Sequence, residues 1–450
     1  MKQIFYTAWL LIIATISYAQ LSPAITCWLQ NTTVTGTYYV SGNSTPVANN
    51  ILVNCQTVQY SANNVYVSTK GVPSYITGPF LDGNPSNASN QNAIFKFPLA
   101  PVQNTGTLTS TTGGDIGVFI NGVALFDYRD GVSWSNSCGC LKGGPLGGAG
   151  DGVWNRDAVV GERGGFDCAK GHPAMGNYHH HQNPSAFNLD LNVISTVCNL
   201  YLADGLYKID STQHSPLLGY AYDGFPIYGA YAYQNINGTG PIVRMKSSFS
   251  LRNITTRTTY YTGTSVTPGP AVSSTYPLGY FREDYQYTAP VSSDYLDDHN
   301  GRFCITPEYP AGTYCYFATV DANWNSYYPY VVGPTFYGVY ANRKVTSITE
   351  STTTYTASGS SISENEFNQL KVSVFPNPAS DLIAIQVGNL VKSDLEIQLI
   401  DMSGRVVATS KINKGSTIAY FDVQSVYAGT YFIKISNGNQ KITKTVIINK

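Results

Sequence analysis

The chain has 450 residues, enough for two or three domains, and a formal net charge of -1. A chain without a large basic or acidic surplus is a poor candidate for binding nucleic acid or an anionic membrane. Charged residues make up only 12% of the sequence, against a usual share of about a quarter, whereas Tyr, Gly, Thr, Ser and Asn are abundant. This balance is typical of an extracellular, mainly β protein.

The N-terminal residues have the layout of a secretory signal peptide. Lys2 supplies a positive charge, residues 4–16 are apolar, and residues 17–19 (Ser-Tyr-Ala) fit the small-x-small pattern read by signal peptidase. The apolar stretch is shorter than the roughly 20 residues that a membrane span needs. We therefore expect residues 1–19 to be a signal peptide, the mature chain to begin near Gln20, and no membrane span to follow.

Eight cysteines follow the predicted signal peptide. An even number in an exported chain favours disulfides, although their pairing cannot be deduced from the sequence. Metal binding by thiolates is the alternative, but outside the cell it would compete with oxidation. The disulfide candidates are Cys27, Cys55, Cys138, Cys140, Cys168, Cys198, Cys304 and Cys315.

A change of composition separates the last part of the chain from the rest. Residues 342–370 are rich in Ser, Thr and Glu and poor in large apolar side chains, so we expect a linker there. In residues 371–450, short runs alternate apolar and polar residues and are separated by turn sequences such as Asn437-Gly438. This pattern predicts a small C-terminal antiparallel β-sandwich.

Four segments of this tail carry recognisable motifs. They are Phe-Pro-Asn-Pro at 375–378 followed by Asp381, Ile-Asp-Met-Ser-Gly-Arg-Val-Val at 400–407, Ala-Gly-Thr-Tyr-Phe at 428–432, and Lys-Thr-Val-Ile-Ile at 444–448. Together they resemble the type A C-terminal sorting domain of type IX secretion. The resemblance implies that the type IX secretion machinery is a partner and that the tail is removed. It also implies a protein that is secreted, extracellular or attached to the outer cell surface.

The central part of the chain is also rich in short predicted strands. Residues 118–126 and 220–228 each place an Asn-Gly or Asp-Gly pair between apolar arms, which predicts two hairpins with type I′ turns and a weak internal repeat. We expect a β-rich N-terminal segment over residues 20–103, whose boundary the sequence does not define. A β-rich domain with long loops should occupy residues 104–341.

Four of the six histidines fall within ten residues: His172, His179, His180 and His181. On an extended strand, His179 and His181 would share one face and His180 would point to the other. Two imidazoles separated by the strand repeat of about 7 Å can share a metal ion, and His172 could add a third ligand. Because neutral imidazole suits zinc and copper, the expected metal is copper or zinc.

These histidines belong to a set of motifs that spans about half of the chain. The set comprises Gly-Val-Trp-Asn-Arg at 152–156, Phe-Asp-Cys at 166–168, Gly-His-Pro at 171–173, Tyr-His-His-His at 178–181, Asn-Pro at 183–184, and the segments 214–229, 300–302, 306–310, 312–314 and 328–334. It resembles the signature of the YHYH domain family. The resemblance implies no defined activity, so the function has to be inferred from the side chains.

Two positions depart from the family pattern. The third residue of the Tyr-His-Tyr-His motif is His180 instead of Tyr, on the face away from His179 and His181. Cys315 stands where the family pattern has a His, so any ligand at that position would be lost. Cys304 and Cys315 flank a predicted turn and could form a disulfide.

We expect His172, His179 and His181 to bind the metal. Three further residues are candidates for supplementary ligands, although each has an ordinary structural explanation: His214, Asp223 and His299. The alternative for the whole cluster is that its imidazoles hydrogen-bond to the backbone and to Tyr hydroxyls within a Tyr-rich interior.

The sequence leaves open whether the chain is an enzyme. A metal-bound water held by three imidazoles would serve a metal-dependent hydrolase, and copper would serve an oxidoreductase. Without a metal, His179 or His172 could be a general base beside Asp167 or Glu162. The sequence has no Gly-x-Ser-x-Gly elbow and no His-Glu-x-x-His motif. We therefore assign no catalytic residue and no organic cofactor.

A non-catalytic surface protein is the other alternative. The Tyr, Trp and Asn content suits contact with an extracellular polysaccharide or matrix by stacking and hydrogen bonding. The candidate stacking residues are Trp134, Trp154 and Trp324, although such aromatic side chains usually belong to the core.

Overall fold

A computed structural model describes residues 21–43, 45–82, 86–187, 206–340, 344–356, 372–387, 394–402, 404–413, 416–437 and 441–450. The expected signal peptide, residues 1–19, lies outside the described residues. The chain divides into two compact units, Met1–Thr356 and Ala357–Lys450. Strands dominate the described parts of both, and the α-helices there, α1 (Pro23–Thr26) and α2 (Ala158–Gly161), are each four residues long. The mainly β fold expected from the composition is confirmed.

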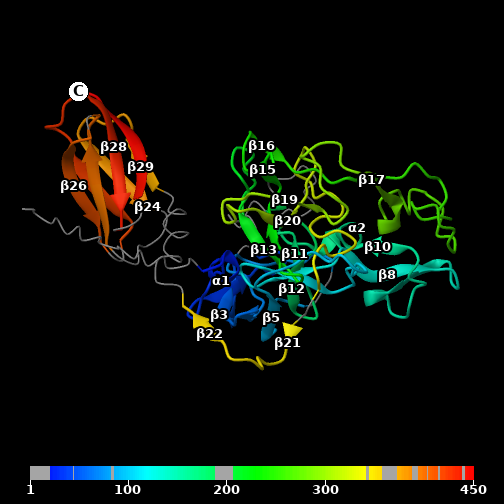
Figure 1. The fold of residues 1–450 in the computed structure, drawn as a ribbon. Helices are drawn as coiled ribbons and strands as arrows, with labels where there is room; N and C mark the ends of the chain where they lie inside the picture. Colours follow the sequence, from blue (N-terminus) through cyan, green and yellow to red (C-terminus); the bar gives the residue numbers. More distant parts are fainter. Residues whose placement is uncertain are drawn as a thin grey trace, which may run out of the picture. The chain divides into compact units, whose positions relative to one another are not determined.

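The first unit contains an antiparallel sheet whose strands come from both ends of the unit (Figure 1). Its order within the described residues is β21-β5-β4-β3-β22. These strands are β3 (Cys55–Tyr60), β4 (Asn64–Thr69), β5 (Ala93–Pro98), β21 (Lys344–Val345) and β22 (Thr353–Tyr355).

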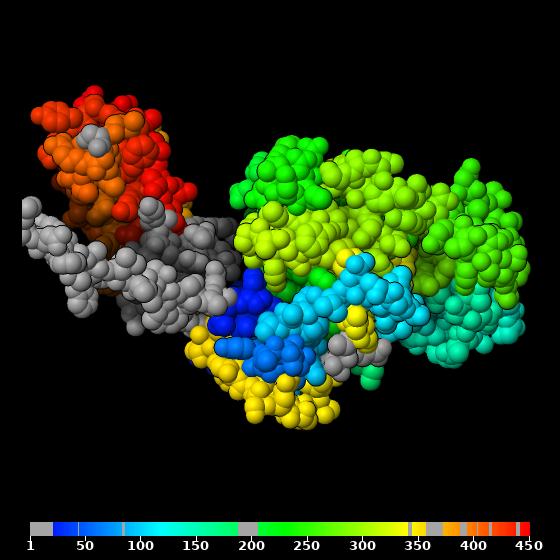
Figure 2. All heavy atoms as spheres, viewed as in Figure 1, coloured from blue at the N-terminus to red at the C-terminus, as the bar shows by residue number. Residues whose placement is uncertain are grey.

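The predicted linker, residues 342–370, contains the two edge strands of this sheet. Strand β22 pairs with β3, and Figure 2 shows the yellow atoms of this part of the chain against blue N-terminal residues. The side chain of Asn64 donates a hydrogen bond of 2.7 Å to the Glu350 carboxylate, and that of Gln59 donates one of 2.9 Å to the Thr352 hydroxyl. The polar composition that predicted a linker is also the composition that suits exposed edge strands.

The N-terminal segment shares one hydrophobic core with the central domain. The rings of Phe97 in β5 and Tyr220 in the central domain stack with their centroids 5.3 Å apart, and Trp28 packs against both. Buried residues of both segments, such as Val58 and Val118, belong to the same cluster. The segment over residues 20–103 is therefore a layer of the first unit and not a separate body.

The central sheet consists, among the described residues, of eight strands in the order β11-β12-β7-β6-β13-β14-β20-β19. They are β6 (Asp115–Phe119), β7 (Ala124–Phe126), β11 (Gly171–Ala174), β12 (Asn177–His180), β13 (Leu217–Ala221), β14 (Pro226–Tyr228), β19 (Gly301–Cys304) and β20 (Thr313–Phe317). The two predicted hairpins, β6–β7 and β13–β14, lie side by side in the middle, and a further hairpin flanks each of them.

The predicted type I′ turns of the central hairpins are wrong. A type I′ turn needs positive φ at both central residues. Only the glycines have it here, with φ of +76° at Gly122 and +88° at Gly224. A two-residue loop with positive φ at both positions instead joins β11 to β12, at Met175 (+51°) and Gly176 (+85°). Asn-Gly and Asp-Gly fit both kinds of loop, so the sequence did not distinguish them.

The internal repeat suggested by the sequence extends over the whole central sheet. Each half consists of a central hairpin, an outer hairpin, and a parallel pairing between them. Counted inward from either edge of the sheet, the outer hairpin comes first and the central hairpin second. The registers also agree: Gly117↔Leu125 and Gly219↔Ile227 in the central hairpins, Gly171↔His180 and Gly301↔Tyr316 in the outer ones, and Leu125↔His180 and Ile227↔Tyr316 between them.

A buried carboxylate holds the outer hairpin of the first half. The Tyr178 hydroxyl donates to both oxygens of Asp167, at 3.0 and 2.9 Å, and the backbone N–H of Gly171 donates to Asp167 at 3.1 Å. The second half repeats this arrangement with Asp297, Gly301 and Tyr314, at 2.8, 3.0 and 3.0 Å. We call each set an Asp-Tyr clamp.

The remaining described elements of the first unit are short strands and single turns joined by long loops. The strands are β1 (Thr35–Tyr38), β2 (Val47–Leu52), β8 (Arg129–Ser135), β9 (Cys140–Gly143), β10 (Asn155–Asp157), β15 (Tyr231–Tyr233), β16 (Ile242–Arg244), β17 (Phe249–Leu251) and β18 (Tyr285–Tyr287). The 3-10 turns are Gly144–Leu146, Arg163–Gly165 and Arg282–Asp284. No helix of the described residues is both long and apolar enough for a membrane crossing.

The second unit is the antiparallel β domain expected from the tail. Its described strands form the sheets β23-β24-β27 and β26-β25-β28-β29, and buried residues of both sheets, among them Ile385 and Ile433, form one core. The strands are β23 (Val372–Phe375), β24 (Leu382–Val387), β25 (Leu395–Ile400), β26 (Val406–Ile412), β27 (Ile418–Asp422), β28 (Gly429–Ser436) and β29 (Lys441–Ile448).

The Asp-Tyr clamp of the second half predicts a strong effect of Gly301→Ala. An added methyl group would overlap the Tyr314 hydroxyl, so the clamp has to open, and we expect a loss of about 1–3 kcal/mol in the free energy of unfolding. Urea denaturation measures it. Gly113→Ala is the control, because a Cβ there meets nothing within 4 Å. Equal stabilities of the two variants would contradict the role of the clamp.

The turn carboxylate Asp223 predicts a pH effect. Its Oδ2 accepts from the Tyr316 hydroxyl at 2.6 Å and from the Gly338 N–H at 2.8 Å, and burial raises its pKa to about 6. The folded protein thus retains a proton that the unfolded chain loses near pH 4. The stability of the wild type relative to Asp223→Asn should therefore fall as the pH rises from about 4 to about 6. Urea unfolding of both proteins across this pH range measures the difference in their free energies of unfolding. A difference that stays constant or rises with pH would show that Asp223 does not have a raised pKa in the folded protein.

Candidate metal centre

Three histidines and a glutamate meet at one end of the first half of the central sheet. His172 lies in β11 directly opposite His179 in β12, and His181 follows that strand. Glu162 is the C-terminal cap of α2, whose first turn is capped by Asp157 through hydrogen bonds to the N–H groups of the helix. The short helix thus carries the carboxylate to the edge of the histidine hairpin.

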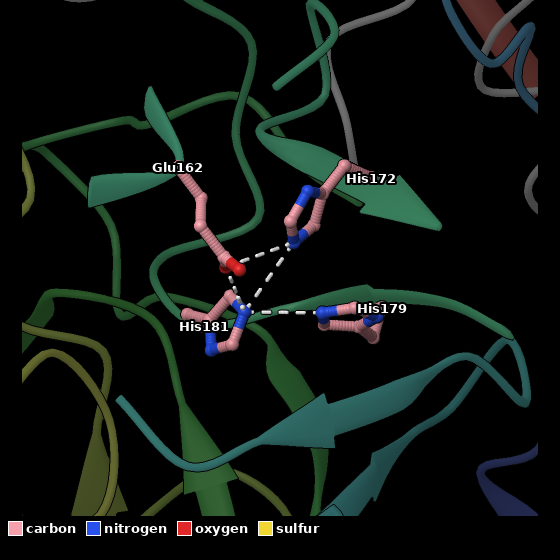
Figure 3. Close-up of side chains that lie close together, drawn as sticks. All are labelled: Glu162, His172, His179 and His181. Atoms are coloured by element: carbon pink, nitrogen blue, oxygen red, sulfur yellow. Dashed lines mark hydrogen bonds and ion pairs between the residues drawn. The ribbon is translucent and has the colours of Figure 1, made fainter. Parts of the chain in front are cut away.

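The ligand atoms of these four side chains point at one another (Figure 3). The Nε2 atom of His181 lies 3.4 Å from that of His172 and 3.0 Å from that of His179. The Glu162 Oε2 atom lies 3.2 Å from His172 Nε2 and 3.1 Å from His181 Nε2. All four atoms lie within 4.8 Å of one another, so the cluster could hold a metal ion.

Backbone carbonyls fix the orientation of two of the imidazoles. The Nδ1 atom of His179 lies 2.8 Å from the Asn177 carbonyl oxygen, and that of His181 lies 2.6 Å from the Asp127 carbonyl oxygen. A carbonyl oxygen only accepts, so both Nδ1 atoms must donate. In their neutral forms, both rings therefore direct an Nε2 lone pair into the cluster.

The charges of the cluster are suited to a cation. Burial would raise the pKa of Glu162, but its hydrogen bonds with His172 and His181 hold that pKa well below its ordinary value. Burial lowers the pKa of His179 far below its ordinary value, so this ring is neutral. Burial would likewise lower the pKa of His181, but Glu162 raises it. The result is a carboxylate beside imidazoles, the usual protein donors for transition metals.

Aromatic side chains shield the cluster from solvent. Phe126 stacks on His179 with ring centroids 3.8 Å apart, and Phe166 meets His172 edge-on at 4.9 Å. His172, His179 and His181 are 5%, 1% and 3% exposed, whereas the side chain of Glu162 is 19% exposed. Solvent thus reaches the cluster mainly at the glutamate.

His180 points to the opposite face of the strand, as the alternation of side chains predicts. Its Nε2 atom lies 2.8 Å from the Tyr75 hydroxyl and its Nδ1 atom 3.1 Å from the Lys170 carbonyl oxygen. Burial lowers its pKa to about 3. The departure from Tyr at this family position therefore leaves the cluster intact.

The three supplementary ligand candidates lie elsewhere. His214 bonds through Nδ1 to the Ser215 carbonyl oxygen at 2.8 Å, and His299 lies beside Thr335. Asp223 lies in the turn between β13 and β14, where its carboxylate accepts hydrogen bonds from Tyr316 and from the backbone. None of these residues belongs to the Glu162 cluster.

Glu162 was not predicted as a ligand. The sequence suggested it only as one of two carboxylates beside a general base, the other being Asp167. Asp167 instead belongs to the clamp with Tyr178, whereas Glu162 contacts His172 and His181. No regular spacing relates Glu162 to the histidines, because a loop and the clamp separate them in the chain.

The cysteines differ in state among the described residues. Cys138 and Cys140 form a disulfide with their Cα atoms 5.2 Å apart, and Cys168 is also disulfide-bonded. Cys198 lies outside the described residues. The other four are free thiols: Cys27, Cys55, Cys304 and Cys315. Cys304 and Cys315, suggested as a pair, lie on the neighbouring strands β19 and β20.

Of the tryptophans suggested as stacking platforms, Trp154 is buried and Trp134 and Trp324 are half-buried. Trp154 is fully buried and donates to the Thr267 carbonyl oxygen at 2.9 Å. Trp324 donates to the Tyr231 hydroxyl at 3.1 Å, and Trp134 meets Tyr276 edge-on. These contacts are typical of core aromatics.

Each of the two units contains a match to a known protein family. Residues 373–449 match the secretion system C-terminal sorting domain, which implies handling by type IX secretion machinery and delivery to the cell surface or exterior. A search of curated proteins found no match. Residues 94–329, more than half of the chain, match the family described as YHYH protein, and they contain all four residues of the cluster. The chain therefore belongs to the YHYH protein family.

Proposed function

We propose that this exported YHYH protein binds one transition-metal ion through Glu162, His172, His179 and His181. The observation that supports it is the convergence of four ligand atoms within 4.8 Å of one another: the Nε2 atoms of three buried histidines and the Oε2 atom of Glu162. In their neutral forms, His179 and His181 both direct an Nε2 lone pair into this space, since both Nδ1 atoms donate to carbonyl oxygens. A divalent cation there would bind these lone pairs and balance the charge of the Glu162 carboxylate.

The distances favour zinc over copper(II). A tetrahedral ion with bonds of about 2.0–2.1 Å separates its ligand atoms by about 3.3–3.4 Å. In a square plane, two of any three ligands are opposite and lie about 4 Å apart. The ligand atoms of Glu162, His172 and His181 form a triangle with sides of 3.1, 3.2 and 3.4 Å. Such a triangle is a face of a tetrahedron and does not occur in a square plane.

Metal analysis of the protein purified after export, without chelators, tests the proposal. We expect about one zinc ion per chain, and after its removal a titration in which Zn²⁺ binds more tightly than Cu²⁺. His179→Ala should weaken binding by at least ~100-fold, because it removes a direct ligand.

The matched control is His214→Ala, which removes an imidazole outside the cluster and should leave the affinity unchanged. A wild type that contains no metal and binds none on titration would rule the proposal out. So would equal losses of affinity in the two variants.

Polysaccharide binding is a second candidate function, supported by a groove in the same unit. The groove has a volume of about 400 Å³ and is lined by Arg244, Lys246, Tyr295 and Tyr327, among others. The phenol rings suit stacking on a sugar, and the Arg244 guanidinium suits an acidic one. Lys246 is paired with Asp294, and Asp321 also lines the groove.

A glycan array tests this second function with the variants Arg244→Ala and His179→Ala. Acidic glycans should bind the wild type, Arg244→Ala should lose most of that binding, and His179→Ala should keep it. Binding that survives Arg244→Ala, or no binding by the wild type, would exclude the groove as the site.

A further inference from the structure

The two halves of the central sheet place different side chains at the positions of the histidine cluster. His172 pairs with His179 between β11 and β12, and the corresponding pair between β19 and β20 is Arg302 and Cys315. The position of His181 corresponds to Phe317 in the second half, two residues after Cys315. The second half therefore has a guanidinium where the first half has its first metal ligand.

Arg302 is almost fully buried, and backbone oxygens surround its charge. Arg302 is only 8% exposed. Its guanidinium donates hydrogen bonds to the carbonyl oxygens of Tyr233, Gln234 and Ser293. The same group lies over the Phe317 ring at 5.8 Å. A planar guanidinium with five donors can join several acceptors in this way without a metal.

The loops joined by Arg302 correspond to those around the histidine cluster. Ser293 lies four residues before the clamp carboxylate Asp297, and Glu162 lies five residues before the clamp carboxylate Asp167. In each half, the segment that leads into the clamp contributes oxygen atoms to a cation site on the outer hairpin. The cation is the protein's own in the second half, and a metal ion would supply it in the first.

The ligand set of the first half has the character of a structural metal site. Structural zinc sites are closed by four protein ligands, whereas catalytic sites keep one position open for water or substrate. Glu162 and the three histidines offer four protein ligand atoms within 4.8 Å of one another, and the three histidines are buried. Four protein ligands are therefore available without water or a substrate.

From these correspondences we infer that the metal ion is a structural cross-link, equivalent to the Arg302 guanidinium of the second half. Each cation ties the segment before an Asp-Tyr clamp to the adjacent hairpin. The inference rests on the proposed metal binding. It predicts that an arginine can replace the metal in the first half.

Thermal unfolding of the full chain, with metal and after chelation, tests the inference. Chelation should lower the Tm of the wild type by at least about 5 °C, and added Zn²⁺ should restore it. His172→Arg should bind no metal yet melt close to the metal-loaded wild type, because its guanidinium can donate to Glu162, His179 and His181. His172→Ala, the matched control, should bind little metal and melt like the chelated wild type.

Arg302→Met supplies an independent measurement. It should lower the Tm while leaving the metal content at one ion per chain. If the wild type holds one metal ion but melts at the same temperature with and without it, the structural role is wrong and metal binding stands. If the wild type binds no metal, the proposed function fails and the inference fails with it. Two results together would also overturn the equivalence. One is a His172→Arg variant with the same Tm as His172→Ala, and the other is a wild type whose Tm barely changes on chelation.

Discussion

A buried carboxylate bonded to a tyrosine hydroxyl holds each outer hairpin of the central sheet, and the positions of the histidines depend on it. Burial raises the pKa of Asp167 to about 7. Hydrogen bonds from Gly78, Gly171 and Tyr178 partly offset the unfavourable burial of its charged form. The Tyr178 ring passes beneath Gly171, where only a glycine leaves room. This contact fixes the register of β11 against β12, which places His172 directly opposite His179.

The same scaffold occurs twice, but among the described residues the cluster of three imidazoles and a carboxylate belongs to the first half alone. The clamp, the hairpin register and the parallel pairing agree between the halves, whereas the side chains on the hairpin face differ. A fold shared by two halves therefore says nothing about the chemistry of either, which depends on the residues placed on it. In the first half these residues form a cluster of imidazoles and a carboxylate, and in the second half a buried arginine occupies the corresponding place.

Much of the site followed from local patterns in the sequence. The alternation of side chains along a strand put His179 and His181 together and His180 on the other face, and the structure agrees. The position of Glu162 did not follow, because its approach to the histidines depends on a capped turn and on a loop of irregular length. Local patterns report neighbours along a strand, not contacts between a loop and a strand.

The same limit explains the other differences. The Asn-Gly and Asp-Gly pairs predicted the central hairpins correctly but not their turn type, because both loop geometries need positive φ at the glycine. The composition of the polar segment after residue 342 predicts a linker, because it has few residues for a core, and it does not reveal the edge strands that the first part of the segment contains. Two short edge strands need no such residues, since backbone hydrogen bonds to β5 and β3 hold them.

In the proposed metal centre, four protein ligands enclose one metal ion. Anomalous X-ray scattering at the zinc edge, from crystals of the exported protein, tests it most directly. We predict a single strong peak in the first unit, about 2.0–2.1 Å from Glu162 Oε2 and from the Nε2 atoms of His172, His179 and His181. No peak at this cluster, or a peak with water in place of Glu162, would contradict it.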